Sequence, residues 1–162
     1  MTKSKQIYLA GAIEAAPDKG TRWRTILTPE LKELGFDVFN PCLETDGAIL
    51  QELGWEKFKW EKIRTPEYRD QYFKIMQRIV EEDLKAVLAS KCIVVYFDKY
   101  VSQGAGTYGE ITLAADKNIP IYLVLAGEMS FETLPAWVVG CVGTPSNVFS
   151  NFRELIAHLK GG

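Results

Sequence analysis

Histidine is almost absent from this chain of 162 residues: His158, in the last predicted helix, is the only one. A histidine base or a histidine triad would have to use that single residue. The three cysteines, Cys42, Cys92 and Cys141, are far apart and have no second histidine to accompany them. This spacing argues against a zinc site and against a disulfide framework, so buried thiols are expected. Any chemistry is therefore expected to be carried by carboxylates.

The sequence also lacks a strong excess of one charge and a long apolar run. Its formal net charge is −2 and its pI is near 5.5, which argues against binding to a nucleic acid polymer but not against a nucleoside or nucleotide. No apolar run approaches the roughly 20 residues that cross a bilayer. The segment "IYLAGAI" after two lysines superficially resembles a signal peptide, but charged residues follow it at once, so we interpret it as a first strand. We expect a cytoplasmic protein without a membrane partner.

The residues that are present predict one α/β domain over residues 1–162. A hydrophobic content of 47% and a charged content of 25% are typical of a globular chain that buries a core. Predicted strands alternate with predicted helices, which favours a parallel sheet with right-handed crossovers. The strands are expected at 6–11, 36–41, 92–97 and 119–125, with a fifth near 147–150, and the helices at 19–35, 68–89, after the loop at 98–106, and at 151–160.

Residues 43–66 do not follow this alternation, because aromatic and charged side chains are mixed there. We expect one short helix with loops, forming an insertion, a lid or a subunit contact. The aromatic residues of this segment are Trp55, Phe58 and Trp60. One interpretation is that they stack on a base, and the simpler one is that they pack within the protein or at a subunit interface.

The stretch "GAGTYGE" at 104–110 places a glycine-rich turn and a carboxylate, Glu110, at a predicted helix start. The simple interpretation is that Glu110 caps the helix in its first turn. The alternative is that it faces a ligand, because ligands of parallel sheets bind at the carboxyl ends of the strands. That rule brings together residues 10–15, 98–106 and the stretch after Val124. The turn is neither a Walker loop nor a dinucleotide fingerprint.

Three further positions have both a structural and a functional interpretation. Asp83 lies four residues from Ile79 and from Val87, so it falls within the apolar face of its helix, where a carboxylate needs a partner and its pKa rises. Asp98, at the end of a central strand, either contacts a ligand or caps a turn. Tyr8 alternates inward in the first strand and is explained by core packing alone. The segment "TRWR" at 21–24 either faces a phosphate or forms a helix surface with its tryptophan turned inward.

Four segments taken together resemble the nucleoside 2-deoxyribosyltransferase family: "IYLAG", "TPEYRDQYFKIMQRIVEEDL", "GAGTYGE" and "ETLPAWVV". The resemblance covers about residues 1–40 and 65–140. It implies a doubly wound, Rossmann- or flavodoxin-like, five-stranded parallel sheet, and a homo-oligomer that is a dimer or a hexamer. It also implies that nucleosides and free nucleobases are the small-molecule partners and that no metal or organic cofactor is needed.

The resemblance also implies a role for each site residue. Glu110 is the nucleophile that attacks the anomeric carbon, Asp83 protonates the departing base, and Tyr8 orients the nucleophile. A carboxylate nucleophile paired with a carboxylic acid is the chemistry of retaining glycosidases. The residues expected to bind substrate are Gly11, Asp98, Gly104, Gly106, Thr107 and Thr133, of which Thr133 is the best match for an asparagine that a neighbouring subunit lends in the family.

One departure from the family pattern leaves the reaction open. Gly104 occupies the position of an aspartate that contacts the sugar hydroxyl in the transferases, although a shifted loop would bring Ser102 near. The related hydrolases of deoxynucleoside 5′-monophosphates carry a serine there that contacts the phosphate. We predict deoxyribosyl transfer between bases, with hydrolysis of 5′-monophosphates and a non-catalytic nucleotide-binding module as the alternatives. A third alternative is an interaction protein whose carboxylates are structural.

Overall fold

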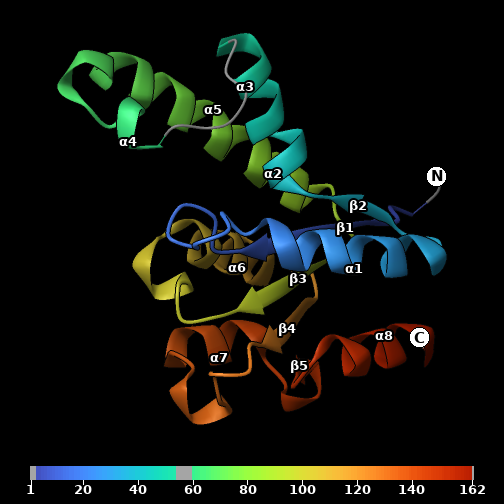
Figure 1. The fold of residues 1–162 in the computed structure, drawn as a ribbon. Coiled ribbons are helices and arrows are strands. Elements are labelled where there is room, and N and C mark those ends of the chain that lie inside the picture. The colour runs from blue at the N-terminus through green and yellow to red at the C-terminus, as the bar shows by residue number, and fades with distance from the viewer. Residues whose placement is uncertain (1–2, 54–59, 162) are drawn as a thin grey trace.

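The computed structural model of the chain describes residues 3–53 and 60–161. A parallel five-stranded sheet forms its centre, in the order β2-β1-β3-β4-β5 (Figure 1). The strands are β1 (Gln6–Gly11), β2 (Asp37–Phe39), β3 (Cys92–Phe97), β4 (Ile121–Leu125) and β5 (Val148–Phe149). This order confirms the predicted α/β fold with a doubly wound parallel sheet. The chain leaves β1 for β2 on one side and returns to β3 on the other, so the strand order reverses between β1 and β3.

Helices cover both faces of the sheet (Figure 1). The longer ones are α1 (Thr21–Glu33), α5 (Arg69–Leu88), α6 (Gly106–Asp116), α7 (Ala136–Val142) and α8 (Phe152–Gly161). Apolar residues of α1 and α8 pack together on one face. Those of α6, α7 and the carboxyl-terminal part of α5 pack on the other. None of the helices in the described residues is long and apolar enough to span a bilayer.

After Gln6 at the start of β1, the central strands are apolar because both of their faces are covered. In β1, Ile7 and Leu9 point toward α1 and α8, whereas Tyr8 and Ala10 point toward α5 and α6. This alternation is the two-residue period of an extended strand. It places the Tyr8 ring on the face of the sheet where the carboxylates of α5 and α6 also lie.

The amino-terminal half of α5 extends beyond the sheet and builds a small core of its own with α3 (Asp46–Leu53) and α4 (Trp60–Ile63), as Figure 1 shows. Its buried residues are Ile49, Ile63, Ile75 and Ile79. The helix α2 (Pro41–Glu44) precedes α3, and the Asn40 side chain caps it by accepting a hydrogen bond from the Cys42 amide. The prediction of a single short helix within 43–66 was therefore wrong, because buried isoleucines anchor both α3 and α4. Trp55 and Phe58, and the side chain of Trp60, lie outside the described residues.

The start of α6 also differs from the prediction. The helix begins at Gly106, so Glu110 lies in its second turn and not in the first. A carboxylate there is too far along the helix to cap the free amides of the first turn. The structure instead buries Glu110, which removes the capping interpretation and leaves the question of what this side chain faces.

Candidate active site

A cavity of about 680 Å³ opens at the carboxyl ends of β1 and β3, next to the point where the strand order reverses. Ligands of doubly wound sheets bind in this place. Its walls include the loop after β1, the loop between β3 and α6, the first turns of α6, the inner face of α5 and the start of α3. Its lining includes Tyr8, Gly11, Glu14, Asp46, Met76, Ile79, Asp83, Gly104, Gly106, Thr107 and Glu110.

Tyr8 and Glu110 meet at the base of this cavity, where the Tyr8 hydroxyl donates a hydrogen bond to Glu110 Oε2. Tyr8 is 0% exposed and Glu110 is 8% exposed. Burial raises the pKa of Glu110 to about 8, the hydrogen bond from Tyr8 acts in the opposite direction, and the charge of Asp83 adds to the rise. Burial also raises the pKa of Tyr8 well above its ordinary value, so the phenol remains a donor.

Asp83 faces the same cavity from the inner face of α5. Its Oδ1 accepts a hydrogen bond of 2.6 Å from the Thr45 hydroxyl, which lies at the end of α2. Burial raises the pKa of Asp83 to about 6, and the hydrogen bond from Thr45 opposes that rise. The structure thus brings the predicted acid, Asp83, and the predicted nucleophile, Glu110, into one cavity. The charge of Asp83 adds to the rise in the pKa of Glu110.

The glycine-rich loop contributes its backbone and one hydroxyl residue to the cavity. Gly104, Gly106 and the buried Thr107 line it, as does Gly11 at the end of β1. A Cβ added at Gly104 or Gly106 would meet no atom within 4 Å, so there is open space next to these glycines. Gly11 is different, because a Cβ there would lie 3.0 Å from the Trp23 ring.

Asp98 and Thr133 are not among the residues that line the cavity. Asp98 Oδ1 accepts a hydrogen bond from the Tyr100 amide at 2.9 Å, which is the turn-capping role that the sequence left open. Thr133 is exposed and forms a capping box with Ser130. Ser102 is also exposed and donates to the Lys99 carbonyl. A contribution of Thr133 to a neighbouring subunit's site stays a prediction.

The burial of Arg24 is a feature that the sequence did not reveal, and this residue lies next to the cavity without lining it. Its side chain is 0% exposed and donates to the carbonyls of Leu9, Gly11 and Gly20 over 2.7–3.2 Å, beneath the loop that follows β1. Its positive charge lowers the pKa values of the cavity carboxyls. The interpretation of 21–24 as a helix surface with an inward tryptophan was right for Trp23 and wrong for Arg24. Arg24 has the helical spacing of the buried Leu27 and Leu31, but a charged residue at such a position is ordinarily expected to reach solvent.

Asp46, the first residue of α3, is the second residue that the sequence did not reveal. It is 8% exposed and lines the cavity. Burial raises its pKa to about 7, the charge of Asp83 adds to the rise, and Arg24 opposes it. It lies in the segment of mixed composition, where no periodicity marks it as buried. Across the described part of the chain, no three His, Cys, Asp or Glu side chains are arranged to hold a metal ion.

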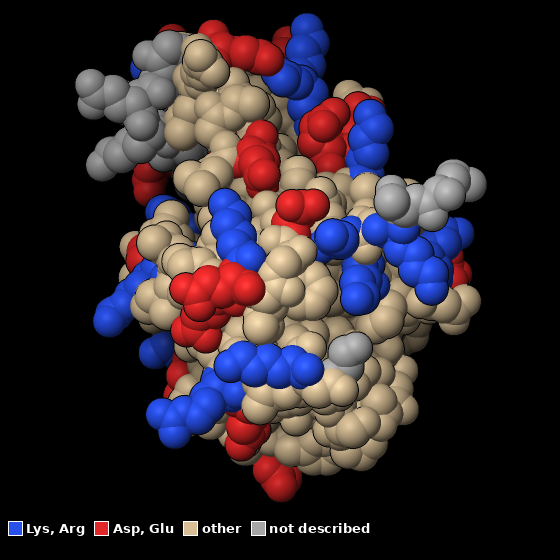
Figure 2. All heavy atoms as spheres, turned by 90° about the vertical axis from the view of Figure 1, so that its right-hand side faces the viewer, with Lys and Arg blue, Asp and Glu red and all other residues tan. Residues whose placement is uncertain are grey.

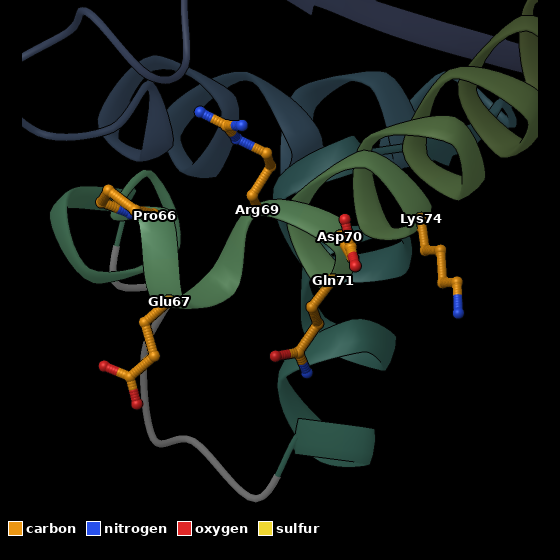
Figure 3. A pocket seen from close by; sticks show the side chains of 6 residues that line it. All are labelled: Pro66, Glu67, Arg69, Asp70, Gln71 and Lys74. Atoms are coloured by element: carbon orange, nitrogen blue, oxygen red, sulfur yellow. The ribbon is translucent and has the colours of Figure 1, made fainter.

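Two other parts of the surface do not bring several functional side chains together in one place. A second hollow lies over the start of α5, where the labelled side chains of Glu67, Arg69, Gln71 and Lys74 point in different directions, as Figure 3 shows. Figure 2 shows acidic and basic side chains interspersed over one face of the molecule. The cavity under the carboxyl ends of the strands is therefore the candidate active site.

No protein-family model and no curated protein sequence matches this chain. Among solved structures, it is similar to a 2-deoxyribosyltransferase from the psychrotolerant bacterium Bacillus psychrosaccharolyticus. The two share 18% sequence identity and a TM-score of 0.56, and the similarity covers 95% of each chain. At this identity the likeness shows that the two proteins share a fold over almost their whole length.

Proposed function

We propose that this protein cleaves the N-glycosidic bond of 2′-deoxynucleosides and transfers the deoxyribosyl group to another nucleobase. The observation that carries the proposal is the pairing of Glu110, held by the Tyr8 hydroxyl, with Asp83 in one cavity at the carboxyl ends of β1 and β3. One carboxylate that attacks and one carboxylic acid that donates a proton are the two groups that a double displacement at a sugar carbon requires. The shared fold with a 2-deoxyribosyltransferase supports the same reaction.

The two half-reactions use these groups in turn. Glu110 attacks the anomeric carbon and forms a glycosyl ester while the bond from that carbon to the base breaks. Asp83 gives its proton to the departing base. The acceptor base then attacks the same carbon, its proton passes to Asp83, and the Glu110 carboxylate is released. Water in place of the acceptor would make the overall reaction a hydrolysis.

The lining of the cavity suits an uncharged nucleoside better than a nucleotide. Met76, Ile79 and other apolar residues of α5 provide a surface for a flat base. The described lining carries four carboxyl groups, those of Glu14, Asp46, Asp83 and Glu110, and one guanidinium, that of Arg64. Arg64 is already paired with Glu14 in a salt bridge. A 5′-phosphate would add negative charge to this surplus of carboxyl groups, and like charges repel.

The reaction requires a particular distribution of protons among these groups. Glu110 must be ionised to attack, and Asp83 must be protonated to donate. The pKa of Glu110, about 8, lies above that of Asp83, about 6, so the active form is a minor one in the free protein. Interacting carboxyls titrate as a group, and a bell-shaped dependence of base release on pH is expected between these values.

The test is to incubate the protein with a panel of nucleosides and their 5′-monophosphates, with and without a second free base, and to separate the products by chromatography. A new nucleoside that forms only in the presence of the second base supports transfer. Free base that appears regardless of the acceptor would replace transfer with hydrolysis. Saturable binding with no base released would point instead to a nucleotide-binding module.

The nucleophile is tested by Glu110→Ala, which should lower base release by at least about 10³-fold. The exposed Glu81 on α5 supplies a matched control, because Glu81→Ala removes a carboxylate outside the cavity. Mass spectrometry of quenched wild-type protein should show a deoxyribosyl adduct on the peptide that contains Glu110. Near-normal turnover by Glu110→Ala would refute the assignment.

A further inference from the structure

Asp46 has no part in the two half-reactions described above, although it lies in the same cavity. The residue is 8% exposed, and it lines the cavity together with Asp83 and Glu110. No hydrogen bond to its carboxyl group is formed by the described residues, whereas Asp83 and Glu110 each accept one from a hydroxyl. A buried carboxyl group without such a partner is costly in an ordinary core. Its oxygens are therefore directed to the cavity.

The junction of α2 and α3 serves Asp83 in two ways. Thr45 donates its hydroxyl proton to Asp83 Oδ1 at 2.6 Å, and the next residue in the chain is Asp46. The two aspartates interact electrostatically through a site that is largely shielded from water. Two carboxyl groups in such a place rarely ionise together, because each charge opposes the other.

From this geometry we propose that Asp46 and Asp83 form an acid pair that holds one proton between them, and that Asp46 keeps this proton available for the departing base. The inference rests on the proposed function, since it assigns a role within that reaction. Asp46 acts through Asp83 and is a positioning residue for the proton. Without the pair, Asp83 would ionise more readily and would lose its proton before the Glu110 carboxylate attacks.

The charge of the site balances through this step. Before attack, Glu110 carries one negative charge and the pair carries another. Forming the glycosyl ester removes the charge of Glu110, and giving the shared proton to the base leaves both aspartates ionised. The total charge of Glu110, Asp46 and Asp83 is −2 before the attack and −2 after the ester has formed. The pair therefore takes over the negative charge that Glu110 gives up. Return of the proton from the acceptor base resets the pair.

Several charged or titratable groups face Asp46 from the surrounding elements. Arg24 of α1 opposes the rise in its pKa, and Cys42 of α2 is itself influenced by Asp46. Tyr8, Arg64, Asp83 and Glu110 line the cavity with it. The pKa of Asp46 is raised to about 7, which agrees with a group that retains a proton near neutral pH.

The first test compares wild type with Asp46→Asn in the pH dependence of kcat/KM for base release. Removing the neighbouring charge lowers the pKa of Asp83, which ionises before Glu110, so the acidic limb should move down by about 1 pH unit and the maximum rate should fall. At pH 8 base release should fall about 10-fold for nucleosides whose base leaves only with a proton. A nucleoside of an N7-methylated purine, which leaves without one, should change less than about 2-fold.

Two variants separate this role from a merely structural one. Asp46→Glu restores a carboxyl group and should return the acidic limb toward the wild-type position. Asp70→Asn, on the exposed surface of α5, is the matched control and should leave both the pH profile and the dependence on the leaving base unchanged. An Asp46→Asn profile that coincides with the wild-type profile, or an equal loss for every leaving base, would overturn the inference.

A second readout needs no catalysis and distinguishes failure of the acid pair from failure of the proposed function. In protein carrying ¹³C-labelled aspartate carboxyls, the titration midpoint of Asp83 should fall by about 1 pH unit in Asp46→Asn. A midpoint that does not move refutes the pair even if the enzyme is active. A midpoint that moves in a protein that releases no base supports the pair and refutes the reaction.

Discussion

Replacing Glu110 with glutamine should stabilise the protein at neutral and alkaline pH while it removes the nucleophile. Glutamine has nearly the same shape as glutamate and still accepts the hydrogen bond from Tyr8, but it never carries a charge. The Glu110 carboxyl is buried, and its pKa rises from 4.5 to about 8. Ionised Glu110 therefore destabilises the folded state, and the glutamine variant does not bear this cost.

The magnitude follows from the pKa values. A rise from 4.5 to about 8 corresponds to at most about 5 kcal/mol of unfolding free energy. Below pH 4.5 the carboxyl is protonated in both the folded and the unfolded state, so its full contribution is present. The stability falls as the pH rises between 4.5 and about 8, where only the unfolded state ionises, and above about 8 the contribution is lost. Because water entry and relaxation reduce the upper limit, we expect Glu110→Gln to gain about 2–4 kcal/mol at pH 8.5.

Urea unfolding of both proteins between pH 4.5 and 8.5 measures this difference. With a slope of about 2 kcal/mol per molar urea, the midpoint of Glu110→Gln should lie about 1–2 M higher at pH 8.5 and should approach the wild-type midpoint at pH 4.5. Glu81→Gln, on the exposed side of α5, controls for the general loss of a carboxylate and should change the midpoint little at any pH. A difference between Glu110→Gln and wild type that does not depend on pH would refute the reasoning.

Two further predictions concern the groups that surround Glu110. Tyr8→Phe removes the hydroxyl that donates to Glu110, so the pKa of Glu110 should rise further, the basic limb of the pH profile should move to higher pH, and base release at pH 7 should fall about 10²-fold. An unchanged basic limb would contradict this. Arg24→Met leaves carbonyl groups beneath the loop after β1 without their donor and should cost about 3 kcal/mol in urea unfolding, whereas the exposed Arg22→Met should cost less than about 0.5 kcal/mol. Equal costs for the two variants would show that the buried hydrogen bonds contribute little.

The regular elements of the fold were predictable because local sequence dictates them. The run at 92–97 is apolar without interruption, the run at 6–11 is apolar after Gln6, and they form the central strands β3 and β1. Gly35, expected as a helix stop, has a φ of 88° after the end of α1. Residues 43–66 could not be assigned in this way, since their helices are stabilised by isoleucines that meet only when α3, α4 and α5 pack together.

The candidate site was predictable only in part. Glu110 was identified because it follows a loop at the carboxyl end of a central strand, and Asp83 because its helical spacing places it on an apolar face. The structure brings both to one cavity with Tyr8. The position of Glu110 within its helix was wrong by one turn, because α6 begins at Gly106 and not closer to the carboxylate.

By itself, the sequence determined a parallel α/β sheet and the strand ends at which a ligand site would form, because apolar runs and their spacing are local properties of the chain. Only the tertiary structure decided that Asp46 lines that site and that Arg24 is buried next to it. The burial of a charged side chain depends on which distant segments cover it, and here the loop after β1 covers Arg24 while α3 carries Asp46 to the cavity beside Asp83. The electrostatics of the three carboxyl groups and the buried guanidinium therefore arise from packing, which no spacing of residues along the chain encodes.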